Sequence, residues 1–217
     1  MKSKILSISI LALILCLISC DDNSISTDPP NMTISQVWTT KNLDVDHYRN
    51  GDKIPQVTDP TEWENLTTGA WCYFNNDPLM GQIYGKLYNG YAVKDSRGLA
   101  PKGWHVPNVD EWNTFIAYAG GMEYAGGKLK EKGSLHWQYP NVEATDKYSF
   151  AALPGGVRRY DGTFANVNKC CCMWTSTEQE VYGTLRLMCT LMYSDSSKIF
   201  IDMPNLGYGM SVRCVKD

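Results

Sequence analysis

The most reactive side chains of this sequence are thiols, and three of them are consecutive. Cys170, Cys171 and Cys172 could present thiolates to a soft metal ion such as Cu(I). They do not predict a zinc site, because structural zinc sites usually separate paired cysteines by two to four residues. The run therefore favours disulfides or unpaired structural thiols over a metal, and we predict no metal and no other cofactor.

A second kind of cysteine chemistry is predicted at the start of the sequence. Lys2 and Lys4 precede an apolar stretch, and Ser19 and Cys20 end it in the way that lipoprotein processing requires. We expect residues 1–19 to be removed as a signal peptide and Cys20 to carry fatty acyl chains, palmitate among them. A membrane-spanning helix would need about 20 apolar residues in a row. The sequence therefore predicts a protein of the bacterial cell envelope that is attached to the outer membrane by lipid. We expect its folded part to be exposed at the cell surface.

Six cysteines remain for the folded domain: Cys72, Cys170, Cys171, Cys172, Cys189 and Cys214. An exported chain meets oxidising conditions, so these thiols could form disulfides. Sequence alone does not fix the connectivity. We expect Cys72 to pair with Cys214, and Cys189 to pair with one member of the 170–172 run.

Two other chemistries are possible for the side chains of this sequence. Hydrolysis needs paired carboxylates, or a nucleophile with a histidine, and the histidines are His47, His105 and His136. We expect His105 to be a core histidine bonded to the backbone and the other two to lie at the surface, so no catalytic residue is predicted.

Sugar binding needs exposed aromatic rings, and four candidates are Trp63, Trp137, Tyr139 and Tyr160. Ordinary burial is the competing explanation for each of them.

The organisation of the chain follows from its composition. Residues 20–36 are rich in polar residues and proline and are expected to be a flexible tether. Residues 37–217 are of the right length for a single domain. The net charge is −3, and loss of Lys2 and Lys4 with the signal makes it −5, which excludes nucleic acid as an expected partner. The many glycines, tyrosines and tryptophans favour short strands over a helical bundle.

Several elements can be predicted along the domain. Strands are expected over residues 37–45, 70–74, 185–193, 198–202 and 210–215, and a hairpin is expected whose two-residue turn is Asp161-Gly162. Residues 107–119 carry apolar side chains with helical spacing, and Asn108 and Glu111 are placed to cap that helix. A second helix, over residues 84–92, has the same spacing but is interrupted by glycines.

Short segments in a fixed order connect the chain to a known family. They are Trp38, Tyr-Arg-Asn-Gly-Asp-Lys-Ile-Pro at 48–55, Gly-Ala-Trp-Cys at 69–72, Gly-Trp-His-Val-Pro at 103–107, Trp-Thr-Ser-Thr at 174–177 and Ser-Val-Arg-Cys at 211–214. Together they resemble the Fibrobacter succinogenes major paralogous domain of bacterial lipoproteins. The resemblance implies an α+β domain with a C-type lectin-like fold, in which antiparallel sheets are accompanied by one or two short helices, and a likeness to formylglycine-generating enzymes.

The function expected from these observations is binding without catalysis. The protein would be a surface-exposed ligand-binding or adhesion module whose partner is a glycan or another surface protein. Two alternatives stay open: a structural surface protein with no small ligand, and an oxidase of the formylglycine-generating type that uses the cysteine cluster. The surrounding motif of that enzyme family is not present around Cys170 to Cys172 or Cys189.

Overall fold

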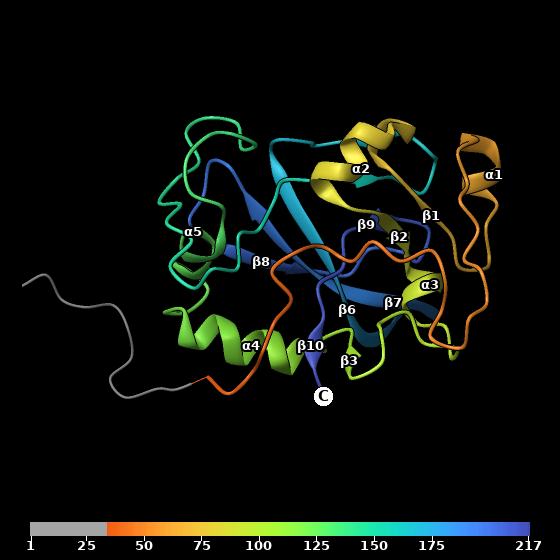
Figure 1. The fold of residues 1–217 in the computed structure, drawn as a ribbon, viewed down its shortest axis with the longest axis horizontal. Helices are drawn as coiled ribbons and strands as arrows, with labels where there is room; N and C mark the ends of the chain where they lie inside the picture. The colour runs from red at the N-terminus through yellow and green to blue at the C-terminus, as the bar shows by residue number, and fades with distance from the viewer. Residues whose placement is uncertain (1–33) are drawn as a thin grey trace, which may run out of the picture.

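The structure is a computed structural model that describes residues 34–217. The predicted signal peptide, Cys20 and most of the predicted tether lie outside these residues. Within residues 34–217 no helix has the length and apolar character needed to cross a membrane. The described chain is an α+β domain of short helices and antiparallel sheets, as the sequence predicted (Figure 1).

The helices are short and the strands belong to three sheets. The helices are α1 (Pro60–Glu64), η1 (Phe74–Asn76), α2 (Pro78–Tyr84), α3 (Gly90–Val93), α4 (Val109–Tyr118) and α5 (Ala125–Leu129). One sheet has the order β1 (Trp71–Cys72), β2 (Leu87–Asn89), β9 (Gly209–Met210), β4 (Val157–Arg158), β5 (Phe164–Ala165). A second pairs β10 (Val215–Lys216) with β3 (Trp104–His105), and the third has the order β6 (Cys170–Val181), β7 (Thr184–Tyr193), β8 (Ile199–Asp202).

The helix predicted over residues 107–119 is confirmed as α4. The Asn108 side chain accepts a hydrogen bond from the Glu111 backbone N–H, and the Glu111 carboxylate accepts one from the Asn108 N–H, which is a complete capping box. Trp112, Phe115 and Ile116 are buried. Local sequence was sufficient here because the cap and the apolar period act within the helix itself.

Three other predicted elements differ in the structure. Residues 84–92 are not one helix, because α2 ends at Gly85 with a φ of 71° and the chain then enters strand β2 before α3. Residues 37–45 contribute only an isolated bridge from Trp38 to Val215. Residues 210–215 divide between β9 and β10, which belong to different sheets. In each case pairing partners far along the chain decided the outcome.

The predicted hairpin is present, but its turn is of another type. Strands β4 and β5 pair with Val157 opposite Ala165 and Arg158 opposite Phe164. A type I′ turn needs positive φ at two central residues, whereas Gly162, with a φ of 79°, is the one turn residue there that has it. The Arg159 N–H donates to the Thr163 carbonyl, which closes a three-residue loop that ends on that glycine.

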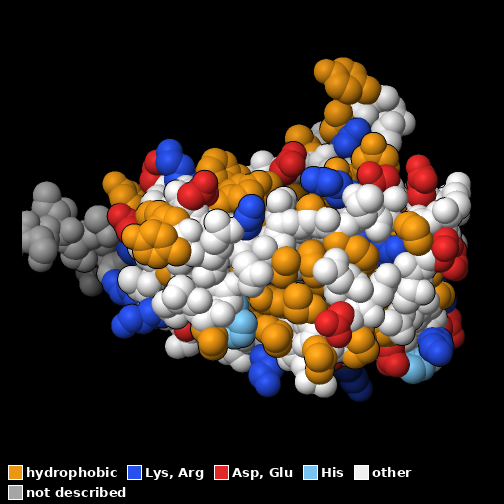
Figure 2. Space-filling view, turned by 90° about the horizontal axis from the view of Figure 1, so that it is seen from above, with side chains coloured by type: hydrophobic (Ala, Val, Ile, Leu, Met, Phe, Trp, Pro, Cys, Tyr) orange, Lys and Arg blue, Asp and Glu red, His pale blue; other side chains and the backbone are white. Residues whose placement is uncertain are grey.

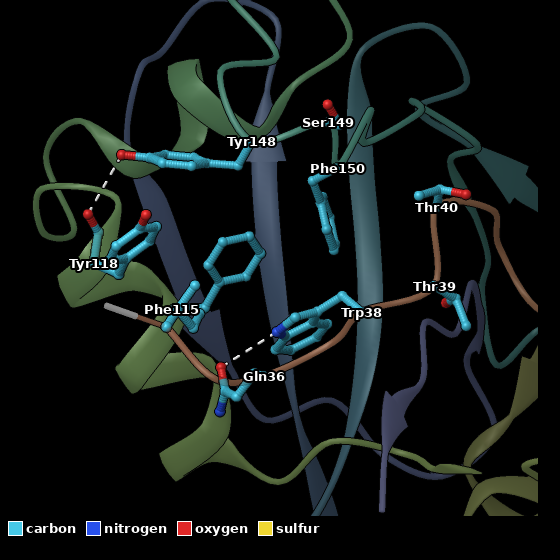
Figure 3. Close-up of a pocket in the computed structure, with 10 residues that line it drawn as sticks. Gln36, Trp38, Thr39, Thr40, Phe115, Tyr118, Tyr148, Ser149 and Phe150 are labelled. Atoms are coloured by element: carbon cyan, nitrogen blue, oxygen red, sulfur yellow. Dashed lines mark hydrogen bonds between the residues drawn. The ribbon is translucent and has the colours of Figure 1, made fainter. Parts of the chain in front are cut away.

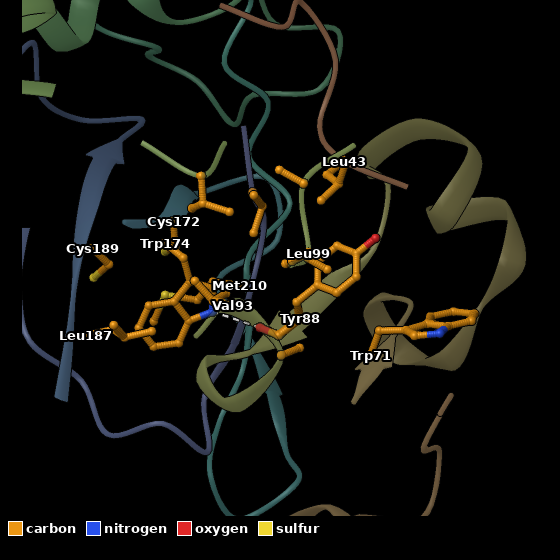
Figure 4. Packing of buried hydrophobic residues seen from close by; sticks show 14 of the residues in the cluster. Leu43, Trp71, Tyr88, Val93, Leu99, Cys172, Trp174, Leu187, Cys189 and Met210 are labelled. Carbon is orange, nitrogen blue, oxygen red and sulfur yellow. Dashed lines mark hydrogen bonds between the residues drawn. The ribbon is translucent and has the colours of Figure 1, made fainter. Parts of the chain in front are cut away.

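Strand β6, which the sequence did not predict, organises the core by alternating its side chains. Cys170, Cys172 and Trp174 face one buried cluster, while Cys171 and Met173 face a second cluster that packs against α4. Figure 4 shows Trp174 in the first cluster, where its indole N–H donates to the Tyr88 carbonyl at 2.8 Å. The strand was missed because both of its faces are buried, so the polar alternation of a half-exposed strand is absent from its first half.

Candidate functional site

A cleft lined with polar and aromatic side chains lies between the β6–β7–β8 sheet and the sheet that contains β4 and β9. We call it the polar cleft, and its volume is about 390 Å³. Its polar and aromatic lining consists of Arg159, Asn166, Arg186, Tyr193, Asp202, Asn205 and Tyr208, and its thiols are Cys170, Cys172 and Cys189. Ligand pockets in proteins typically measure about 300–1,000 Å³, so the cleft has the size of a small-molecule site.

Tyrosine rings form the aromatic part of the polar cleft. Tyr208 lies in the segment between β8 and β9, and its ring centroid is 5.9 Å from that of Tyr160. Tyr160 belongs to the β4–β5 loop and is 49 % exposed. On the β7 side, the ring of Tyr193 contacts Phe200 at 5.7 Å. The two loops therefore place a pair of partly exposed rings beside the cleft's hydrogen-bonding groups.

The segment between β8 and β9 is held in a tight turn. The Asn205 side-chain oxygen accepts a hydrogen bond from the Gly207 N–H at 3.0 Å, and the Gly207 carbonyl accepts one from the Trp63 indole at 2.8 Å. An isolated bridge joins Asn205 to Arg186. These contacts fix Tyr208 relative to strand β7, so the aromatic side of the cleft is positioned before any ligand arrives.

Buried thiols lie at the inner end of the polar cleft. The Sγ atoms of Cys170 and Cys172 are 2.9 Å apart on the same side of β6. The hydrogen bond from Cys170, followed by burial, raises the pKa of Cys172, and burial raises the pKa of Cys189. A raised pKa keeps these two thiols protonated at neutral pH and lowers their nucleophilicity. They are packing groups of the first core cluster.

The predicted disulfides are not present in the structure. All six cysteines of the described chain are free and buried. Cys72 packs in a cluster with Trp63 and Phe74, whereas Cys214 packs in the cluster of Trp174. Cys171 points to the opposite face of β6 from its two neighbours, so the three consecutive thiols cannot converge on one metal ion. Within residues 34–217 no group of three or more Cys, His, Asp or Glu side chains is arranged to hold a metal.

The structure buries two of the four aromatic candidates and leaves the other two exposed. Trp63 is 1 % exposed, stacks against the Arg158 guanidinium and so belongs to the core. Trp137 is 2 % exposed and donates its indole N–H to the Ala152 carbonyl. These two predictions are wrong, because large apolar rings fill the interior when a backbone acceptor is within reach. Tyr139 is 83 % exposed but does not line the cleft. Of the four candidates, Tyr160 is the one beside it.

A second hollow, the aromatic pocket, lies between the start of the described chain and α4 (Figure 3). Its volume is about 220 Å³, and the rings around it are Trp38, Phe115, Tyr118, Tyr148 and Phe150. Most of these rings also pack against one another: Trp38 lies 5.2 Å from Phe115 and 5.8 Å from Phe150. No charged side chain lines it. We regard it as the open edge of the second core cluster and as a weaker candidate than the polar cleft.

Each of the three histidines pairs with at least one carboxylate. His47 is exposed and lies 2.7 Å from Asp46, and His136 is paired with Glu131 at 2.9 Å. His105 differs from the prediction, because it bonds to two carboxylates and not to the backbone. Its Nδ1 lies 2.7 Å from Asp217 and its Nε2 lies 2.7 Å from Glu111. The histidine therefore ties the last residue of the chain to the first turn of α4.

This arrangement predicts a pH dependence of stability. Burial lowers the pKa of His105, but the hydrogen bonds with Asp217 and Glu111 outweigh it and leave the pKa raised. A raised folded-state pKa means that His105 stabilises the fold below its unfolded pKa, about 6.5, and loses this effect as the pH rises through the folded value. His105→Gln should therefore cost more stability at pH 5.5 than at pH 8.5.

The stability cost of His105→Gln at pH 5.5 should exceed its cost at pH 8.5 by less than about 1 kcal/mol, since the imidazole is 37 % exposed and partly screened by water. Urea unfolding of both proteins at each pH measures it. An equal cost at both pH values would show that the two carboxylates do not stabilise the imidazolium.

The residues of the candidate site that the sequence did not predict are Tyr208, Asn205 and Arg186. A signal for the first two was present: residues 205–209 read Asn-Leu-Gly-Tyr-Gly, an aromatic flanked by glycines in a connection between strands. Loops that carry binding residues often have this character. The sequence around Arg186 carried no such signal, because its place in the cleft depends on the β-bridge with Asn205, a residue of a different segment.

Comparisons with known proteins identify the family but not the activity. The family model described as the Fibrobacter succinogenes major domain matches residues 34–216, beginning just before the domain boundary expected at residue 37. No curated protein and no solved structure gives a significant match. Because the family model covers nearly all of the described residues, the chain belongs to the Fibrobacter succinogenes major domain family, as its ordered motifs suggested.

Proposed function

We propose that this protein is a non-catalytic binding module of the bacterial cell envelope and that it binds carbohydrate in the polar cleft. It is anchored through lipid on Cys20 and displayed on the outer membrane. The domain has a C-type lectin-like fold in this proposal. Support for the fold comes from the bridge between Trp38 and Val215, which brings the two ends of the domain side by side.

The observation that carries the proposal is the composition of the polar cleft. Sugar rings present apolar C–H faces and hydroxyl edges, so they bind where aromatic rings lie beside hydrogen-bonding side chains. Tyr208 and Tyr160 supply the rings, and Asn166, Asp202 and Asn205 supply acceptors and amide donors. The turn contacts of Asn205 hold this set in place, and so less conformational entropy is lost on binding.

The proposal of a binding module is also supported by the low reactivity expected of the cysteine and histidine side chains. An oxidase based on the cysteine cluster would need reactive thiolates, whereas the hydrogen bond from Cys170 and burial raise the pKa of Cys172, and burial raises the pKa of Cys189. The candidate histidines are engaged in pairs with carboxylates on other parts of the surface. Neither set of residues provides an activated nucleophile in the polar cleft.

A second candidate function is adhesion to another surface protein. Leu135 and Tyr139 are 82 % and 83 % exposed, and both lie in the segment between α5 and β4. Exposed apolar side chains of this kind are common in protein interfaces. This surface is separate from the polar cleft, so the two candidates can be tested with different variants.

The test is a glycan array with the full lipoprotein in detergent, with and without EDTA. We expect binding that survives the chelator, because no metal is part of the proposed site. Replacing Tyr208 with Ala should weaken binding of any positive glycan at least tenfold, the effect of removing a central aromatic contact worth more than about 1.4 kcal/mol. Titration of the positive glycan by calorimetry measures the loss.

The matched control is Tyr139→Ala, which removes an equally large and more exposed ring outside the polar cleft. It should bind as tightly as the unmodified protein. If Tyr139→Ala abolishes binding while Tyr208→Ala does not, the polar cleft is not the site. An array without any positive glycan would favour the adhesion function instead.

A further inference from the structure

The charge of the polar cleft is opposite to that of the protein. The chain has a net charge of −3, and acidic and basic side chains are interspersed on the face seen in Figure 2. The lining of the cleft instead has two guanidinium groups, on Arg159 and Arg186, and one carboxylate, on Asp202. A locally basic hollow on an acidic protein favours an anionic ligand.

Arg186 has hydrogen-bonding capacity that the protein leaves unused. Its Nη1 atom donates to the Met203 carbonyl at 3.2 Å, which holds the guanidinium at the wall of the cleft. Its Nε atom is buried and has no hydrogen-bond partner. A buried donor without a partner is unfavourable, and an acceptor supplied by a ligand would remove that cost.

Arg159 lies at the rim of the same cleft, next to Tyr160 in the β4–β5 loop. Its side chain is exposed and makes no hydrogen bond or ion pair within residues 34–217. Asp161 is the nearest acid in sequence; its pKa is lowered chiefly by a hydrogen bond from Thr163, with the charge of Arg159 adding to the effect. The guanidinium of Arg159 is therefore available to a ligand.

Asp202 limits what the cleft accepts. One of its carboxylate oxygens takes a hydrogen bond from the Met203 N–H at 2.7 Å, and its charge remains in the lining. A ligand with several negative charges would be repelled there, whereas a sugar hydroxyl could donate to the second oxygen. The chemistry of the lining thus fits one negative charge beside hydroxyl groups.

We infer that the polar cleft selects a saccharide that carries a carboxylate, such as a uronic acid, with Arg186 and Arg159 binding the carboxylate. This inference rests on the proposed function and adds the ligand class to it. The planar guanidinium matches a carboxylate geometrically, because its parallel N–H groups can donate to both oxygens. Tyr208 and Asp202 contact the remainder of the sugar.

The test compares two ligands that differ only in this group: methyl galacturonoside and methyl galactoside, titrated into the full lipoprotein in detergent. The uronoside should bind at least tenfold more tightly at low salt, and the preference should shrink as sodium chloride is raised. Arg186→Gln and Arg159→Gln should each reduce the preference for the uronoside over the galactoside.

Two further measurements make the outcomes distinct. Arg97→Gln serves as the control, because Arg97 is already paired with Asp52 and Asp95 away from the cleft, and it should leave the preference unchanged. Sodium acetate should not compete at concentrations similar to those of the uronoside; if it does, the cleft is a simple anion site and the inference is overturned.

The failure of the inference differs from the failure of the proposed function. Equal, Tyr208-dependent affinity for both sugars would overturn the carboxylate preference while leaving carbohydrate binding intact. No binding of either sugar, together with a blank glycan array, would overturn both. Arg159→Gln keeps the test valid if Arg186→Gln unfolds the protein, because the Arg159 side chain is exposed and has no hydrogen bond or ion pair within residues 34–217.

Discussion

Replacing Arg213 with Ala should lower the free energy of unfolding by about 4 kcal/mol, a large share of the stability of a single domain. The Arg213 side chain is fully buried. Its guanidinium donates to the Asn42 side-chain oxygen and to three carbonyls, those of Thr39, Phe150 and Ala151. It therefore joins the start of the domain, the 150–151 segment and the last strand region in a single set of hydrogen bonds.

The effect is large because truncation of Arg213 leaves hydrogen-bond acceptors without a donor. The Phe150 carbonyl loses a buried hydrogen bond, and two further carbonyls and the Asn42 amide oxygen lose partly buried ones. A fully buried group left unsatisfied costs about 1–3 kcal/mol, and a partly buried one costs less because water can reach it. Part of this loss of stability is offset, because the alanine variant no longer buries a charge. Burial lowers the pKa of Arg213 to about 10, so the interior disfavours the charged guanidinium. The balance remains strongly destabilising.

Urea unfolding of the chain from residue 21 onward, followed by tryptophan fluorescence, measures this difference. Arg213→Lys should cost less than Arg213→Ala, since an ammonium group keeps the charge and three donors. The matched control is Arg97→Ala, which removes a guanidinium whose ion pairs lie at the surface and should cost much less stability. A loss for Arg213→Ala as small as that of the control would contradict the assigned role of this buried network.

The second large effect is expected at Cys20. Replacing Cys20 with Ser should move the protein from the membrane fraction to the soluble or unprocessed fraction and abolish fatty-acid labelling. Each acyl CH₂ buried in the bilayer contributes about 0.8 kcal/mol, so two or three chains hold the domain firmly and their loss removes the anchor. Fractionation after metabolic labelling with an alkyne fatty acid measures both properties.

Cys16→Ser is the matched control, because Cys16 lies in the part of the sequence that processing is expected to remove. It should label and fractionate like the unmodified protein. Continued labelling and membrane attachment of Cys20→Ser would show that another residue carries the anchor, and the proposed display on the outer membrane would lose its support.

The sequence was most informative where structure is decided locally. Helix α4 was predictable because Asn108, Glu111 and the buried faces of Trp112 and Phe115 all lie within a few turns of one another. The strands around Gly162 were predictable for the same reason, although the turn contained one more residue than expected. The family was also evident, because short motifs kept their order along nearly the whole chain.

The candidate site was much less predictable. Tyr160 was identified by its residue type, but Trp63 and Trp137 have the same chemistry and are core residues, and burial cannot be read from a single aromatic. The expected pairing of Cys72 with Cys214 failed because the two thiols pack in different core clusters, and Cys189 is also a free thiol although it shares a cluster with Cys170 and Cys172. His105 found its partners in Glu111 and in Asp217, which lies 112 residues away in the chain.

By itself, then, the sequence determined the α+β class, the family and the helix α4, and it predicts the lipid anchor. These depend on local periodicity, on capping and on motifs that are read in order. Only the tertiary structure decided where the candidate site lies. The polar cleft joins the β4–β5 loop, β6, β7 and the segment before β9, and its mix of tyrosine rings, guanidinium groups and one carboxylate exists only once those distant segments are packed together.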